Sequence, residues 1–252
     1  MAKAKNKEAA IGSQNRTVSP NEAKSALTHC IKLQRPIMMW GAPGIGKSDI
    51  VKQIADAEAR EVIDIRLPLW EPTDIKGIPY YNSKENNMVW ASPAELPTDP
   101  KSNAIVFLDE LNSAAPAVQA AAYQLILNRR VGQYHLPEGV SIVAAGNRDS
   151  DKGVTYRMPA PLANRFVHIE LRVDFEDWLQ WATNEHIHAD VVGYCTFAKQ
   201  DLYDFDPRGS SRSFATPRSW SFVSQLLSDD LPESTLTDLV AGCVGEGLAV
   251  KF

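Results

Sequence analysis

The sequence has no long apolar run, few cysteines and no excess of positive charge, and each of these absences excludes a class of protein. No apolar stretch approaches the roughly 20 residues that a transmembrane helix needs, and the basic, polar start lacks the apolar segment of a signal peptide. The three cysteines, Cys30, Cys195 and Cys243, lie far apart without a CxxC pair, which argues against a disulfide scaffold or a zinc site. We therefore expect a cytoplasmic protein with reduced thiols and no membrane contact.

Composition and charge are those of an ordinary globular protein. The chain has 252 residues, 44% of them hydrophobic, which is enough for one large domain or for a large domain with a small one. Its formal net charge is -5, so no global basic signal indicates nucleic acid or an anionic membrane as a partner. His186 and His188 would point to different faces of a helix, so we expect solvated or capping histidines rather than metal ligands.

Short apolar or alternating runs separated by helical stretches predict an α/β fold. The helical stretches in this part cover residues 20–33, 48–60 and 116–130, and the first and third carry proline at their start. Apolar runs of this kind between helices predict a five-stranded parallel sheet with helices on both faces. The runs cover residues 37–40, 62–67, 104–108, 140–145 and 167–171.

The strand pattern stops after Leu171, which divides the chain near residue 172. We expect residues 1–18 to be a flexible tail, residues 19–172 an α/β domain and residues 173–252 a small all-helical domain. The helices predicted in the last part cover residues 175–184, 186–200, 216–228 and 235–250, and Thr216-Pro217 is a favourable start for the third of them.

Two stretches interrupt the α/β pattern and predict functional insertions. Residues 68–98 are rich in proline and aromatic residues, with a hairpin expected from Tyr80 to Trp90 that turns at Asn86-Asn87. Residues 129–140 resemble a second hairpin just before the fourth strand. Long insertions in a compact domain are more often functional than idle. The aromatic side chains of the first insertion fit a partner-binding surface or a small core of the insertion equally well.

The segment GAPGIGKS at residues 41–48 matches the GxxxxGK[ST] pattern of a phosphate-binding loop. It follows an apolar strand and precedes a helix, so backbone N–H groups and the positive end of the helix can face an anion. Lys47 would reach the β- and γ-phosphates of ATP, and the Ser48 hydroxyl would bind Mg²⁺. The nucleotide-binding residues predicted from this loop are Gly41, Ala42, Pro43, Gly44, Ile45, Gly46, Lys47, Ser48 and Asp49.

The segment IVFLDE at residues 105–110 predicts the second half of the site. An apolar strand delivers Asp109 to the carboxyl edge of the sheet, where ligands bind in open α/β folds. Asp109 would hold Mg²⁺, directly or through water. Glu110 would orient or deprotonate the attacking water. The two motifs together predict a Mg-ATP-binding protein that hydrolyses its nucleotide.

The order of the motifs resembles that of an AAA+ ATPase of the MoxR-type group. GAPGIGKS and IVFLDE are followed by AAGN, PLANRF and TPRSW, at residues 144–147, 161–166 and 216–220. The resemblance implies that residues 68–98 are the insertion in the second helix and residues 129–140 the hairpin before sensor 1. It also implies that the helical domain is a lid, and that the chain either is complete in its catalytic parts or is cut soon after the lid.

The same resemblance implies roles for three further side chains. Asn147 matches sensor 1, which contacts the γ-phosphate or the attacking water, although Arg148-Asp149 follows it instead of proline. Arg165 matches the arginine finger that reaches a neighbouring subunit, with Arg157 and Arg148 as competing candidates. Arg218 matches sensor 2, which contacts phosphate from the same chain. The predicted catalytic set is Lys47, Asp109, Glu110, Asn147, Arg165 and Arg218.

Membership of this group would imply a chaperone-like machine. Such a protein forms a ring of identical subunits, here expected to be a hexamer, and remodels a protein substrate or works with a von Willebrand factor A domain protein. Two alternatives stay open at this point. One is a nucleotide-gated switch with incidental turnover, against which the intact Glu110 and Asn147 weigh. The other is a DNA-acting motor, against which the acidic composition weighs weakly.

Overall fold

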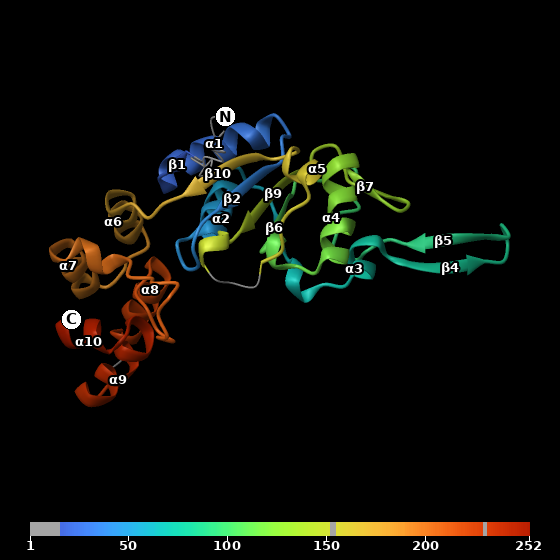
Figure 1. The fold of residues 1–252 in the computed structure, drawn as a ribbon. Helices are drawn as coiled ribbons and strands as arrows, with labels where there is room; N and C mark the ends of the chain where they lie inside the picture. Colours follow the sequence, from blue (N-terminus) through green and yellow to red (C-terminus); the bar gives the residue numbers. More distant parts are fainter. Residues whose placement is uncertain (1–15, 152–154, 229–230) are drawn as a thin grey trace, which may run out of the picture.

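The computed structural model describes residues 16–151, 155–228 and 231–252, and it has a central parallel sheet with a group of helices to one side (Figure 1). The sheet has six strands in the order β1-β10-β2-β9-β6-β3. They are β1 (Thr17–Val18), β2 (Ile37–Trp40), β3 (Val62–Arg66), β6 (Ile105–Asp109), β9 (Ser141–Gly146) and β10 (Val167–Leu171).

The α/β class is confirmed, but five strands were predicted and six are found. The additional strand β1 pairs with β10 at one edge of the sheet, in a segment that the sequence assigned to the tail. Two residues are too short for an alternating pattern to be visible in the sequence. The other five strands agree with their predicted ranges to within one residue at each end.

Neighbouring residues along each strand pack on opposite faces of the sheet. Met39 faces α1 (Pro20–Lys32) and α2 (Lys47–Ala57), whereas Met38 lies in the cluster that includes α4 (Pro116–Asn128). The short helices α3 (Pro72–Lys76) and α5 (Ala160–Ala163) contribute to this second cluster. Burial on both faces explains why these strands are continuously apolar.

Two hairpins extend from the side of the sheet that α4 covers. The longer, β4 (Ile78–Asn82) with β5 (Asn87–Ala91), projects from the body (Figure 1). The shorter consists of β7 (Arg130–Val131) and β8 (Tyr134–His135). Both were predicted, but the turn expected at Asn86-Asn87 was misplaced, because Asn87 pairs with Asn82 and the turn covers residues 83–86.

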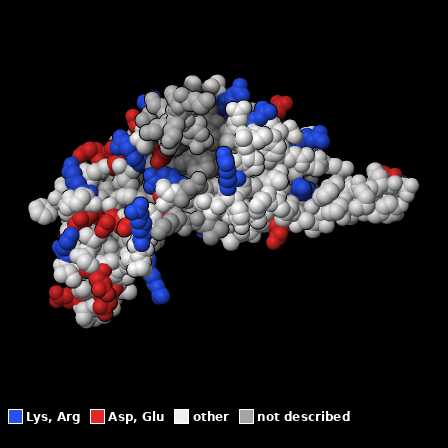
Figure 2. Space-filling view, viewed as in Figure 1, with Lys and Arg blue, Asp and Glu red and all other residues white. Residues whose placement is uncertain are grey.

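Some aromatic residues of the first insertion are partly buried, and others are exposed as on a partner-binding surface. Trp70 packs against the core of the α/β part, and Trp90 is partly buried, with its amide donating to Gln133 of the short hairpin. Tyr80 and Tyr81 are instead 51% and 59% exposed. Figure 2 shows few charged side chains on this face of the projecting hairpin.

Among the residues that the structure describes, five helices follow the sheet and share a third apolar cluster built around Trp178 and Trp220. They are α6 (Phe175–Asn184), α7 (Ala189–Phe197), α8 (Pro217–Leu226), α9 (Glu233–Val244) and α10 (Glu246–Lys251). The predicted helix over residues 235–250 is two helices, because Gly245 has a φ of 97°, outside the helical range.

The helix predicted over residues 186–200 starts later than expected. His186 has a φ of 55°, which separates α6 from α7, and the His188 side chain caps α7 by accepting from the amide of Asp190. The described part of the chain also has four 3₁₀ turns: η1 (Leu67–Leu69), η2 (Leu111–Ser113), η3 (Asp149–Asp151) and η4 (Lys199–Leu202). Within the described ranges, no helix is long and apolar enough to cross a membrane.

Candidate ATP site

The glycine-rich loop connects β2 to α2 at the carboxyl edge of the sheet. Lys47, the first residue of α2, folds back over the loop, and its Nζ donates to the backbone oxygens of Gly41 at 2.7 Å and Ala42 at 2.9 Å. Gly44 has a φ of +76°, and a Cβ at this position would lie 2.7 Å from Thr216 Oγ1. Both the curl of the loop and its contact with α8 therefore require glycine here.

The order of the strands places Asn147 between the two motifs. Strand β9 lies between β2 and β6, so Asn147, which follows β9, emerges between the loop and Asp109. The Lys47 Nζ donates a third hydrogen bond to Asn147 Oδ1 at 3.2 Å. Residues 100 positions apart in the sequence thus meet at the point where the motifs predicted a phosphate site.

The electrostatics of Lys47 show which charges surround the loop. Burial is the largest influence and lowers the pKa of this ammonium to about 8, and the positive charge of Arg218 acts in the same direction. The carboxylates of Asp109, Asp151 and Glu110 oppose this shift. A buried ammonium whose positive charge is only partly offset by nearby carboxylates is suited to bind a polyanionic ligand.

Asp109 and Glu110 differ in their backbone conformation. Asp109 is the last residue of β6, and its Oδ1 accepts from the amide of Glu110 at 2.9 Å. Glu110 has a φ of 54° and a ψ of 36°, the left-handed region, and its side chain is exposed. A non-glycine residue held in this region costs on the order of 1–3 kcal/mol and is often found at functional sites.

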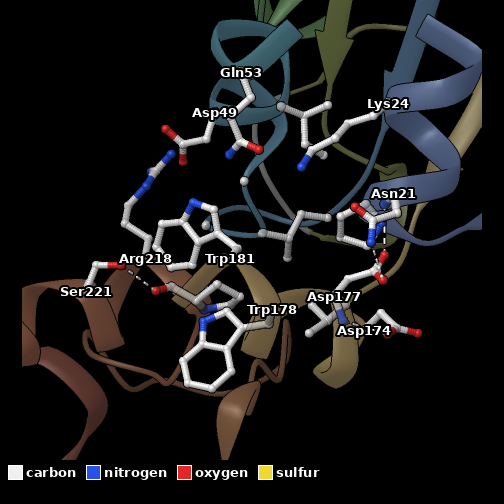
Figure 3. A pocket seen from close by; sticks show the side chains of 17 residues that line it. Asn21, Lys24, Asp49, Gln53, Asp174, Asp177, Trp178, Trp181, Arg218 and Ser221 are labelled. Atoms are coloured by element: carbon white, nitrogen blue, oxygen red, sulfur yellow. Dashed lines mark hydrogen bonds between the residues drawn. The ribbon is translucent and has the colours of Figure 1, made fainter. Parts of the chain in front are cut away.

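A cleft lies beside the glycine-rich loop. Its walls come from α1, the loop with α2, and helices α6 and α8 (Figure 3). The Trp181 ring lines the cleft, and Arg218 and Asp49 point toward each other across it. The indole N–H of Trp178, also in the wall, has no hydrogen-bond partner among the described residues.

Hydrogen bonds join the surrounding elements at two opposite ends of the cleft. The amide of Arg218 donates to the Gly44 oxygen at 3.2 Å, which brings the start of α8 against the glycine-rich loop. At the other end, the backbone and side-chain amides of Asn21 each donate to a carboxylate oxygen of Asp177 at 2.8 Å (Figure 3). The helices after the sheet are thereby held against both the loop and α1.

The predicted arginines are not all brought to this site. Arg218 lines the cleft, whereas Arg165 lies two residues before β10, whose first residue, Val167, pairs with Ile37 at the start of β2. Because the loop follows the other end of β2, Arg165 lies at the opposite edge of the sheet, and its side chain is exposed.

The two other candidates for a finger differ in their surroundings. Arg157 is exposed and lines a groove on the outside of α4 and α5. Arg148 is already engaged, with hydrogen-bonded ion pairs to Asp151 at 3.0 Å and Glu170 at 3.1 Å. These two carboxylates raise the pKa of the Arg148 guanidinium further and hold the side chain within its own chain.

Comparison with known proteins is consistent with this geometry. Residues 36–168, more than half of the chain, match the profile of the ATPase family associated with various cellular activities (AAA). The chain belongs to this family. The matched segment contains the glycine-rich loop, the Asp109-Glu110 pair and Asn147, which form the site, and also Arg165 at the other edge of the sheet.

Similar proteins extend the comparison beyond the AAA segment. Midasin from Giardia intestinalis is 29% identical over 175 residues, which is 64% of this chain, but this chain spans only 4% of that protein's length. Among solved structures, an ATPase from Cytophaga hutchinsonii gives a TM-score of 0.50 at 19% identity, covering 88% of this chain and 62% of that one. NtrX from Brucella abortus, solved with ADP, gives 0.51 at 13% identity, covering 84% and 50%.

Sequence reasoning missed several residues at the site of this AAA ATPase. The cleft residues Asn21, Trp178 and Trp181 carry no motif, because they come from helices outside the matched segment. Asn112 was also missed, although it is only 1% exposed and hydrogen-bonds to the backbone of Asn147. The available signal was a polar residue two positions after Glu110, between Leu111 and Ser113.

The pKa of Lys47 leads to a prediction about the pH dependence of ATP binding. Because the free ammonium has a pKa of about 8 and a bound triphosphate would raise it, binding above pH 8 must take up a proton. We expect ATP affinity to fall between pH 7.5 and 9.5, approaching about tenfold per pH unit at the upper end. Calorimetry in buffers of different ionisation enthalpy measures the proton uptake directly. In the Lys47→Arg variant, whose guanidinium stays charged, this dependence should disappear.

Proposed function

We propose that this protein is a MoxR-like ATPase that binds Mg-ATP in the cleft and hydrolyses it. The observation that carries the proposal is the position of Lys47. Its ammonium bridges the loop to Asn147 and lies within the electrostatic influence of Asp109 and Glu110. A triphosphate that replaces the loop oxygens as the partner of Lys47 would lie next to the groups that this chain itself supplies for the reaction.

The nucleoside part of ATP would lie on the apolar side of the cleft. Trp181 offers a flat aromatic surface there. Arg218 lines the same cleft next to the loop, which supports its proposed role in contacting phosphate from within the chain. The contact of α8 with the loop would make the orientation of the helical lid, residues 173–252, sensitive to the nucleotide.

The residues at the loop also fit Mg²⁺. Ser48 and Asp109 supply one hydroxyl and one carboxylate, and Mg²⁺ in nucleotide sites uses few protein ligands besides phosphate oxygens and water. A bound Mg²⁺ would neutralise phosphate charge. The chain's own groups would do the rest: Lys47 positions the phosphates, Glu110 orients the attacking water and accepts its proton, and Asn147 contacts the water or the γ-phosphate.

The Glu110→Gln substitution tests the chemical step. We expect ATP binding to persist while turnover falls about 100-fold or more, because glutamine keeps the shape but cannot accept the proton. Steady-state release of phosphate, together with nucleotide binding measured by calorimetry, gives both quantities. As a matched control, Glu61→Gln changes an exposed glutamate at the opposite edge of the sheet and should leave turnover unchanged. Equal turnover in Glu110→Gln and the original protein would remove Glu110 from the mechanism.

We further propose that the protein acts in the cytoplasm as a ring, with a hexamer of identical subunits as the expected form. Arg165 is at the edge of the sheet away from its own loop, so a neighbouring subunit is the site it can serve. The projecting hairpin, with Ile78 66% exposed and Tyr80 and Tyr81 exposed beside it, supports a protein partner as the substrate that is remodelled. A von Willebrand factor A domain protein is the partner class that the MoxR resemblance suggests.

A further inference from the structure

Asn112 lies in the 3₁₀ turn η2, which follows the Asp109-Glu110 pair. It belongs to none of the motifs to which a role in nucleotide binding was assigned. It is only 1% exposed. Its side chain points at the backbone of the residue that follows β9. Nδ2 donates to the Asn147 oxygen at 2.8 Å, and Oδ1 accepts from the Asn147 amide at 3.2 Å. One side-chain amide therefore occupies both backbone polar groups of Asn147, as the backbone of a neighbouring strand would.

The packing around this contact leaves the Asn112 side chain little room to move. A Cβ on Gly146 would lie 2.5 Å from Asn112 Oδ1 and 2.6 Å from Met38 Cε, so the amide presses directly against the end of β9. The Asn112 backbone oxygen in addition accepts from the Tyr156 amide at 2.7 Å. A buried amide that is hydrogen-bonded through both its nitrogen and its oxygen favours this arrangement, because any other would break these two bonds.

The side chain of Asn147 points the other way, toward the glycine-rich loop. Its Oδ1 accepts from Lys47 Nζ at 3.2 Å. Asn112 thus connects the turn after β6, where Asp109 and Glu110 lie, to Asn147 after β9. Asn147 is the residue whose side chain contacts Lys47. Without Asn112, Asn147 would keep its place in the sequence but lose the two bonds that set its backbone.

We infer that Asn112 is a positioning residue for hydrolysis, which acts by holding Asn147 in register with Lys47 and the Asp109-Glu110 pair. This inference rests on the proposed ATPase activity. It makes Asn112 important for the chemical step and not for nucleotide binding, because the loop, Arg218 and the cleft are untouched. A displacement of about 1 Å of a catalytic group can cost on the order of 100-fold in rate.

The test compares Asn112→Ala and Asn112→Asp with the original protein. We expect kcat to fall about 10- to 100-fold in Asn112→Ala, with KM for ATP changed less than about threefold. Asn112→Asp keeps the size and the acceptor but, when ionised, cannot donate to the Asn147 oxygen, so its kcat should fall as well. Hydrogen exchange at the Asn147 amide should speed up in Asn112→Ala, and this readout needs no turnover.

Gln119→Ala is the matched control, since Gln119 is 3% exposed and its side chain donates to the Ala114 oxygen at 3.0 Å in the same region. It should lower stability to a similar degree and leave kcat unchanged. If Asn112→Ala does not fold, Asn112→Asp alone decides the question.

A double-mutant cycle separates action through Asn147 from any other role. If Asn112 works through Asn147, then Asn112→Ala should have little further effect on kcat in a protein that already carries Asn147→Ala. Full additivity of the two substitutions would overturn the inference, and so would an unchanged kcat in both Asn112 variants. An original protein without ATP turnover would instead remove the proposed function itself, so the two failures are distinguishable.

Discussion

Replacement of Lys47 by alanine is expected to abolish tight binding of Mg-ATP. The ammonium is the cation that the loop itself supplies, and its hydrogen bonds to Gly41 and Ala42 hold it where the phosphates would lie. Removing one partner of a desolvated charge pair commonly costs several kcal/mol, so we expect affinity to drop about 100-fold or more. Isothermal calorimetry with a non-hydrolysable ATP analogue and Mg²⁺ measures the change without interference from turnover.

The control for this experiment is on the same helix. Lys52→Ala removes an exposed lysine from α2 and lowers the positive charge of the protein by the same amount. It should bind the analogue as the original protein does. If Lys47→Ala also kept its affinity, the glycine-rich loop would not be the phosphate site, and the roles proposed for Asp109 and Asn147 would lose their support.

The meeting of the motif residues at one edge of the sheet could be predicted in large part, because each motif stands at the end of a strand. Apolar runs predicted strands β2, β6 and β9, and the residues that come directly after parallel strands lie at one edge of the sheet. The meeting of Lys47 with Asn147 is a consequence of this arrangement. The strand order itself, with β9 between β2 and β6, has no local signature in the sequence.

Other features depend on contacts between distant residues and could not be predicted. The left-handed backbone of Glu110 is unfavourable for a non-glycine residue and is imposed by its surroundings. The role of Asn112 depends on its contact with Asn147, 35 positions away. The two-residue strand β1 forms because it pairs with β10 at the edge of the sheet. In contrast, the division of the last predicted helix at Gly245 had a visible signal, since glycine commonly ends helices.

Replacement of Arg165 by alanine is expected to leave ATP binding intact and to lower turnover strongly. An arginine finger supplied by a neighbour stabilises the charge of the transition state and can contribute about 10³–10⁵ in rate. The geometry supports action on a neighbour, because Val167 pairs with Ile37 at the start of β2 while the loop follows the end of that strand. Arg35→Ala, an exposed arginine at the same edge of the sheet, is the matched control and should retain full activity.

A mixing experiment shows whether this arginine acts between subunits. Lys47→Ala chains cannot bind ATP but still carry Arg165, whereas Arg165→Ala chains bind ATP but offer no finger. Where the ATP of an Arg165→Ala chain faces a Lys47→Ala neighbour, a complete site exists, so a mixture should recover part of the activity that each variant alone lacks. Co-assembly is verified by pull-down through a tag on one variant. A co-assembled mixture that stays inactive would exclude action of Arg165 on a neighbour. Arg157 would then be tested next, because Arg148 is held by Asp151 and Glu170 within its own chain.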